Sequence, residues 1–150
     1  MSSLESKQVL ARQLRELIGL YLASQRRHAH DQGLSQQGRL LMLLRKHGPS
    51  PQGDFGRLAG LDKSWISRII ERFVADGLVE RQPLASDRRC LELHLTPTGD
   101  EEARRYDEVL TAHAETFFDM IPGERHAALE SALDAIVGAL RAQQQTRTKA

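Results

Sequence analysis

The residues best suited to chemistry in this sequence are hydroxyl and guanidinium groups between positions 61 and 99. Serines and arginines recur at helical spacing from 64 to 72, and two more arginines follow an aspartate at 87. Hydroxyl groups and an arginine on one helix face suit the base edges in the DNA major groove. An extended arginine suits the minor groove, where the negative potential is strong. The pattern predicts DNA contacts by Ser64, Ser67, Arg68, Arg72, Arg88 and Arg89.

The first group of side chains requires a helix. Apolar residues recur every three or four positions between 66 and 74, so they fall on one face, away from the serines and arginines. Asp62 or Ser64 suits the N-cap, and Gly77 suits an exit from the helix through a left-handed residue. The residues predicted to face inward are Ile66, Ile69, Ile70, Phe73 and Val74.

The second group requires a hairpin. From 90 to 95 three leucines alternate with Cys90, Glu92 and His94, which is typical of a half-buried strand. Residues 78–82 are the expected partner strand, joined to it through 83–87. A helix followed by an arginine-tipped hairpin indicates a winged helix-turn-helix. The predicted fold class is therefore mainly α with a small β-hairpin wing.

An ordered set of short motifs runs through the same stretch. Asp87, Arg88 and Arg89 are followed by the pair Leu95-Thr96 and by Gly99. Upstream lie Leu58-Ala59, Ser67-Arg68, and Gly77-Leu78 followed by Arg81. In this order and spacing the motifs resemble the MarR family of bacterial transcription regulators. The resemblance covers 34–99 by motif, and the whole chain by length and helix order.

This resemblance implies an obligate homodimer on a pseudo-palindromic operator in double-stranded DNA. Arg89 would enter the minor groove, and Asp87 would brace the wing by pairing with Arg89 or Arg72. Alternatively, Asp87 is an ordinary turn residue that caps its own backbone, and Arg72 is a solvated helix charge. Trp65 departs from the small or polar residue usual at its position. It could stack on a sugar or a thymine methyl group, or pack against the preceding helix, which we favour.

Further helices are predicted on both sides of this stretch. The first spans about 10–33, and a short helix capped by Ser35 and closed by Gly48 follows it. A second short helix is opened by Ser50 and Pro51, with Phe55, Leu58 and Leu61 facing inward. A long helix then runs from Thr96 and Pro97 to about Met120, and the last helix follows Pro122. The first and the last two carry apolar faces that a small domain has difficulty covering, so we expect a second copy to cover them rather than the monomer's own core. The expected organisation is one unit over 1–150, with a DNA-binding part at 34–99 and a helical dimerisation part at 1–33 and 100–146.

Charge and cysteine content agree with a DNA-binding protein of a reducing cytoplasm. The net charge is only +1, yet residues 1–99 carry 15 Lys and Arg against 10 Asp and Glu, whereas residues 100–150 carry 6 against 10. The basic charge thus lies in the part of the chain that contains the predicted DNA-binding residues. The single cysteine excludes an internal disulfide. No apolar run is long enough to span a bilayer and no signal peptide is visible, so no membrane partner is expected.

The sequence contains no catalytic or phosphate-binding motif, so neither an enzyme nor a cofactor is expected. His28 and His30, beside Asp31, could ligate a metal only with help from another segment, and we favour solvated polar residues. Cys90 could sense oxidants if Arg89 lowered its pKa, although we prefer an incidental thiol on the exposed face of the second strand. A redox- or metal-responsive regulator is the alternative function, and a protein-interaction module is disfavoured by the wing arginines.

The resemblance also implies a small effector, often an aromatic or phenolic acid, bound by the first, second and fifth helices. By location alone the candidates are Tyr21, Arg39, Met42 and Tyr106. For Tyr21 and Met42 we prefer plain core packing. Repression is the usual outcome in such proteins, and activation instead depends on where the operator lies relative to a promoter.

Overall fold

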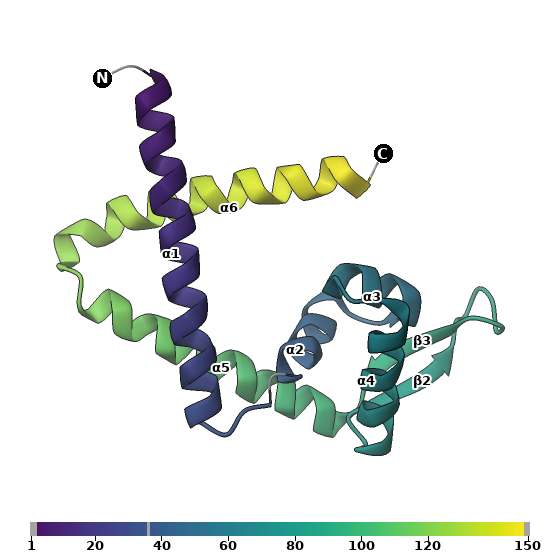
Figure 1. Cartoon of the computed structure of the whole chain (residues 1–150). Helices are drawn as coiled ribbons and strands as arrows, with labels where there is room; N and C mark the ends of the chain where they lie inside the picture. Colours follow the sequence, from purple (N-terminus) through teal and green to yellow (C-terminus); the bar gives the residue numbers. More distant parts are fainter. Residues whose placement is uncertain (1–2, 36, 149–150) are drawn as a thin grey trace. The chain divides into compact units, whose positions relative to one another are not determined.

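The computed structural model describes residues 3–35 and 37–148, and it divides into two compact units, residues 1–111 and 112–150 (Figure 1). The described residues form mainly helices with one small antiparallel sheet, which confirms the predicted fold class. The elements in order are α1 (Ser3–Asp31), α2 (Gly38–His47), β1 (Ser50–Pro51), α3 (Gln52–Ala59), α4 (Lys63–Ala75), β2 (Val79–Pro83), β3 (Leu91–Leu95), α5 (Pro97–Asp119), the 3-10 turn η1 (Gly123–Arg125) and α6 (His126–Thr148). Among them no helix is long and apolar enough to cross a membrane.

The predicted hairpin is present, shifted by one residue. β2 pairs antiparallel with β3 from Val79 opposite Leu95 to Pro83 opposite Leu91, so the connection is 84–90 rather than 83–87. Pro83 is tolerated because β2 is an edge strand in the order β1-β3-β2. The strand β1 was not predicted: Ser50 lies opposite Leu93 on β3 instead of opening a helix. The helix α3 begins only at Gln52, after Pro51 at its N-cap.

One hydrophobic core joins α2, α3, α4, the sheet and the start of α5. The stripe on α4 is buried as predicted except for Val74, which is 37% exposed, and on α3 Leu58 is 44% exposed although it was expected to face inward. Both residues lie at the margin of their apolar stripe, where a small rotation of the helix decides burial. The buried residues of this core are Leu40, Leu41, Leu44, Phe55, Ile66, Ile69, Ile70, Phe73, Val79, Leu93 and Ala103.

The start of α2 differs from the prediction. Gln37, not Ser35, is the N-cap residue, and it makes no side-chain cap. The Ser35 hydroxyl accepts a hydrogen bond from the Gln37 amide at 3.2 Å, so it stabilises the turn before the helix. Gly48 ends the helix as predicted, with φ of 79° and its N–H donating to the Leu44 carbonyl.

The unit over 112–150 contains the end of α5, the turn η1 and α6. The turn is held by His126, whose Nε2 lies 3.1 Å from the Phe118 carbonyl and 3.0 Å from the Ile121 carbonyl. Because carbonyl oxygens only accept hydrogen bonds, Nε2 carries the proton and donates to the end of α5. Pro122 separates α5 from the last helix as predicted, at the N-cap of η1.

Candidate nucleic-acid interface

The helix α4 has the two faces that a reading helix needs. Its apolar side is fixed in the core, and the polar positions Ser64, Arg68 and Arg72 are exposed. Ser67 is half-buried, and its hydroxyl donates weakly to Glu71 at 3.5 Å. Arg72 makes an ion pair with Asp76 one turn later, with 3.8 Å between Nε and the carboxylate. Two guanidinium groups therefore face solvent from one side of a rigid helix.

The first turn of α4 is organised by Asp62. Its Oδ1 accepts the Trp65 amide N–H and the Ser64 hydroxyl, both at 2.9 Å. These hydrogen bonds, that of Trp65 first, lower the pKa of Asp62, so the cap stays ionised at neutral pH and is lost only as the pH falls through that lowered value. Of the two predicted capping residues, Asp62 is the N-cap. The Ser64 hydroxyl donates its proton to this cap, which leaves it to act as an acceptor.

Trp65 does not pack as expected. Its side chain is 57% exposed, which makes our preferred interpretation, packing against the preceding helix, wrong. The residue follows Lys63 and Ser64 in the first turn of α4, and its backbone is held by the Asp62 cap. The core beneath α4 is already filled by residues such as Ile66 and Ile69, so there is no space there for an indole.

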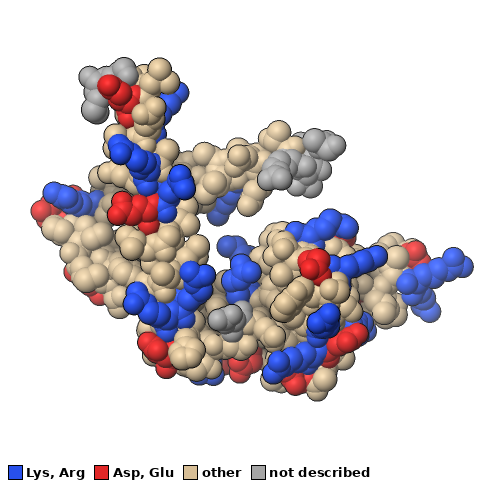
Figure 2. Space-filling model, in the orientation of Figure 1, with Lys and Arg blue, Asp and Glu red and all other residues tan. Residues whose placement is uncertain are grey.

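The loop between β2 and β3 carries Arg88 and Arg89, both exposed. This loop lies at the outer end of the hairpin (Figure 1), where Figure 2 shows lysine or arginine side chains at the surface. Asp87 does not pair with either predicted arginine side chain. Its Oδ1 accepts the backbone N–H of Arg89 at 3.0 Å, and its carbonyl accepts the amide of Cys90 at 3.0 Å. The turn-residue alternative is therefore the correct one: Asp87 shapes the tip through the backbone. Both arginine side chains are left to point into solvent.

Cys90 lies in the loop, one residue before β3, rather than on a face of the strand. The thiol lies 3.6 Å from Asp87 Oδ2 and donates to it. The charge of Asp87, and then this hydrogen bond, raise the pKa of Cys90, so the lowering by Arg89 that the redox-sensing alternative requires does not occur. A raised pKa keeps the thiol protonated at neutral pH, and a protonated thiol is a poor nucleophile.

The raised pKa predicts that the Cys90 thiol is alkylated slowly and that a single substitution increases the rate of alkylation. Asp87→Asn removes the negative charge but keeps an oxygen for the Arg89 amide, so Cys90 should be alkylated by iodoacetamide severalfold faster than in the parent at pH 7.5. Cys90→Ser, which has no thiol, is the blank for the mass-spectrometric readout. Equal rates in parent and Asp87→Asn would contradict the role of Asp87.

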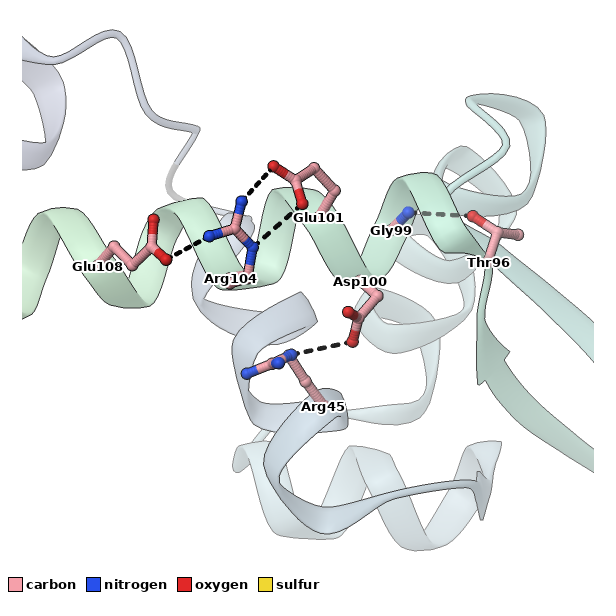
Figure 3. A network of polar contacts seen from close by, with 7 residues as sticks. All are labelled: Arg45, Thr96, Gly99, Asp100, Glu101, Arg104 and Glu108. Carbon is pink, nitrogen blue, oxygen red and sulfur yellow. Dashed lines mark hydrogen bonds and ion pairs between the residues drawn. The ribbon is translucent and has the colours of Figure 1, made fainter.

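A set of contacts that the sequence did not suggest connects the hairpin to α5 (Figure 3). The Thr96 hydroxyl accepts the Gly99 amide at 3.0 Å, capping α5, and donates to the Gly77 carbonyl at 2.6 Å. The Thr96 amide donates to the Leu78 carbonyl at 3.1 Å. Gly99 packs so closely on Leu78 that an added Cβ would lie 1.8 Å from the Leu78 oxygen. These contacts set where the wing leaves the domain relative to α4.

Ion pairs along α5 complete this network. Arg45 at the end of α2 reaches Asp100 at 2.9 Å, which connects α2 to the first turn of α5. Arg104 bridges Glu101 and Glu108 on α5 itself (Figure 3). These side chains are exposed to solvent, which screens the ion pairs, so the pairs serve mainly to orient the helices.

Of the four candidate effector residues, Met42 and Tyr106 lie in one cluster, and Arg39 is near enough for its charge to act on Tyr106. Tyr106 is buried with Ala29 and Leu110, and Met42 packs against this cluster, as preferred for Met42. Burial raises the pKa of Tyr106, and the charge of the exposed Arg39 opposes the shift. Tyr21 is half-buried on α1 and is not part of the cluster.

A groove of about 570 Å³ nevertheless opens between α2 and α5, beside Met42. Its other lining residues, which sequence reasoning missed, are Arg45, Lys46, Asp100 and Asp107. The basic end of α2 was the signal that could have found them. No group of three or more possible metal ligands occurs in the described parts of the chain, around His28 and His30 or elsewhere.

Residues 35–91 match the model of the MarR family. The structure of the transcriptional regulator Tm0710 from Thermotoga maritima is similar over 92% of this chain and 98% of that one, with a TM-score of 0.71 and 25% identity. Residues 35–91 of the chain thus belong to the MarR family. The predicted winged helix-turn-helix is thereby confirmed, and membership agrees with the expectation of no catalytic site, since MarR-family proteins are transcription regulators rather than enzymes.

Two curated relatives match this chain over shorter segments. The HTH-type transcriptional repressor NicR of Pseudomonas putida is 39% identical over 59 residues, which are 39% of this chain and 37% of that protein. The uncharacterised HTH-type transcriptional regulator YdgG of Bacillus subtilis is 29% identical over 98 residues, 63% of this chain and 64% of that protein. The matched segments thus span less than two thirds of each curated relative.

Proposed function

We propose that this chain is a transcription regulator that binds double-stranded DNA as a homodimer. The observation that carries the proposal is the exposed polar face of α4 together with the arginine-tipped hairpin, both held by one buried core. The match to the MarR family and the similarity to NicR, a transcriptional repressor, support it. With DNA as the partner, the protein would act in the cytoplasm.

The contacts follow from the shapes of the two elements. α4 would lie in the major groove, where Arg68 donates to base edges and Ser64 and Ser67 add polar contacts. Arg88 and Arg89 would extend from the hairpin to the backbone and the adjacent minor groove, where no acidic residue but Asp87 lies nearby in the loop. Arg72, whose ion pair with Asp76 is long and exposed, is free to exchange that partner for a phosphate.

Dimerisation would use the apolar surfaces of the long terminal helices. On α1 five large apolar side chains between Leu4 and Leu20 are at least 45% exposed, and on α6 Leu133, Val137 and Leu140 are exposed at helical spacing. Stripes of this kind rarely remain uncovered in a soluble protein. A second copy would cover both stripes, and it would also present a second reading head to the other half-site.

Control by a small effector is the finer part of the proposal. The groove beside Met42 carries Arg45 and Lys46, whose charges suit the carboxylate of a small aromatic acid. An acid bound there would compete with Asp100 for Arg45 and so loosen the attachment of α5 to α2. Release of DNA on such binding would make the protein a ligand-responsive repressor.

The proposal is tested by selection of bound duplexes from a random library, together with sedimentation equilibrium. We expect an inverted repeat with half-site centres about 10 bp apart, one helical turn, and a mass of two chains. A single asymmetric half-site, or the mass of one chain, would contradict the proposal.

A further inference from the structure

The indole of Trp65 is a large apolar surface that its own domain leaves mostly uncovered. The side chain is 57% exposed, although aromatic side chains are highly buried on average. Arg68 and Arg72 follow three and seven residues later, so the three side chains lie on the same side of α4. An exposed aromatic group flanked by two guanidinium groups suits a polyanion that also offers apolar groups.

The position of the indole is fixed by the fold. Asp62 Oδ1 accepts the Trp65 amide at 2.9 Å, and Ile66, the next residue, is 2% exposed in the core. The backbone of Trp65 is therefore held from both sides, and binding has to order only two side-chain torsions. The first turn is also the part of a reading helix that meets base edges.

We infer that Trp65 contacts the 5-methyl group of a thymine in the major groove and makes the protein select thymine at one position of each half-site. The inference rests on the proposed DNA-binding function. An indole has one N–H donor and no acceptor, so most of its surface can only make apolar contacts. The thymine methyl is the apolar group among the base edges of the major groove, and the other base pairs present donors and acceptors there. Arg72 holds a phosphate and Arg68 donates to a neighbouring base edge while the indole covers the methyl group.

The test removes the thymine methyl group from the DNA and leaves the indole of the protein in place. In the selected operator duplex, each thymine is replaced in turn by 2′-deoxyuridine, which lacks only the methyl group. We expect one position per half-site at which the parent loses about fourfold in affinity, and about fifteenfold when both half-sites are changed, as for loss of one buried methyl-sized group each. Trp65→Ala should bind the thymine and deoxyuridine duplexes equally.

Arg89→Ala is the matched control, because it should weaken binding to both duplexes and keep the parent's ratio between them. Trp65 is also the chain's single tryptophan, so its fluorescence reports on this side chain alone. We expect the emission to change on addition of the thymine duplex to the parent.

Four outcomes would overturn the inference. Enrichment of no sequence would overturn it together with the proposed function. A defined operator with no deoxyuridine-sensitive position would overturn the inference but not the proposed function. If the Trp65 fluorescence still changed on binding to that operator, Trp65 would be assigned to a sugar contact. A deoxyuridine effect that persists in Trp65→Ala would assign methyl recognition to another residue. A changed sedimentation mass for Trp65→Ala would assign the indole to a protein interface.

Discussion

Replacing Gly99 with alanine is expected to destabilise the winged domain by about 3 kcal/mol or more. The added Cβ would lie 1.8 Å from the Leu78 carbonyl oxygen and 2.8 Å from its carbon, and backbone atoms cannot move aside as a flexible side chain can. Relief requires α5 to move from β2, which breaks the hydrogen bond from the Thr96 amide to Leu78. In thermal unfolding followed by circular dichroism, the midpoint should fall by roughly 6–12 °C for a chain of this size.

Gly53→Ala is the matched control for this prediction. Gly53 lies in α3 of the same domain, and its Cβ would meet nothing within 4 Å. Because alanine favours a helix interior over glycine by about 0.5–1 kcal/mol, this variant should melt at or above the parent midpoint. Both variants are compared at equal protein concentration, since the midpoint of a dimer depends on it. A Gly99→Ala midpoint equal to that of the parent would show that the close approach to Leu78 carries no stability.

The spacing of neighbouring residues was sufficient to predict most of the winged helix-turn-helix. The spacing of Ile66, Ile69, Ile70 and Phe73 placed α4 in the core, and Gly77, with φ of 71°, ends that region in the left-handed conformation that the sequence indicated. Such features depend on neighbours within four residues, so the sequence contains them directly. The strand β1 has only two residues, one of them a proline, and it exists because Leu93 lies opposite, some forty positions later. No periodic pattern can predict a pairing of that kind.

The candidate site was harder to predict where long-range contacts or the geometry of a loop determine what a side chain contacts. The sequence placed Asp87 among arginines, yet the conformation of the seven-residue loop turns its carboxylate onto the Arg89 amide and the Cys90 thiol. The pKa of Cys90 is therefore raised, opposite to the lowering that the redox-sensing alternative requires. Trp65 sits at the margin of the apolar stripe, where burial depends on the neighbouring helix rather than on spacing. Gly99 was recognised as part of a motif, but only the structure gives the physical reason, its contact with Leu78.

Replacing Arg89 with alanine should weaken operator binding by about 30-fold or more while leaving the protein folded. The described residues around the hairpin tip offer the Arg89 guanidinium no hydrogen bond or ion pair, whereas its backbone amide keeps the bond to Asp87 in any variant but proline. Truncation therefore removes a contact to DNA and little else. Direct contacts of this type contribute about 1–3 kcal/mol each, and a symmetric dimer loses two of them. Fluorescence anisotropy with the selected operator, at one fixed salt concentration, measures the change.

Arg141→Ala separates this effect from the loss of a positive charge as such. Arg141 is exposed on α6, in the other compact unit. The substitution Arg141→Ala therefore removes one positive charge, as Arg89→Ala does, at a position that is not proposed to contact DNA. The affinity of Arg141→Ala should stay within about twofold of the parent, because no DNA contact is proposed for this side chain and a single exposed charge contributes little through screened solvent. If the two variants lose affinity equally, the hairpin arginine acts only through net charge. If Arg89→Ala binds like the parent, the hairpin does not enter the minor groove, and the sequence preference has to come from α4 alone.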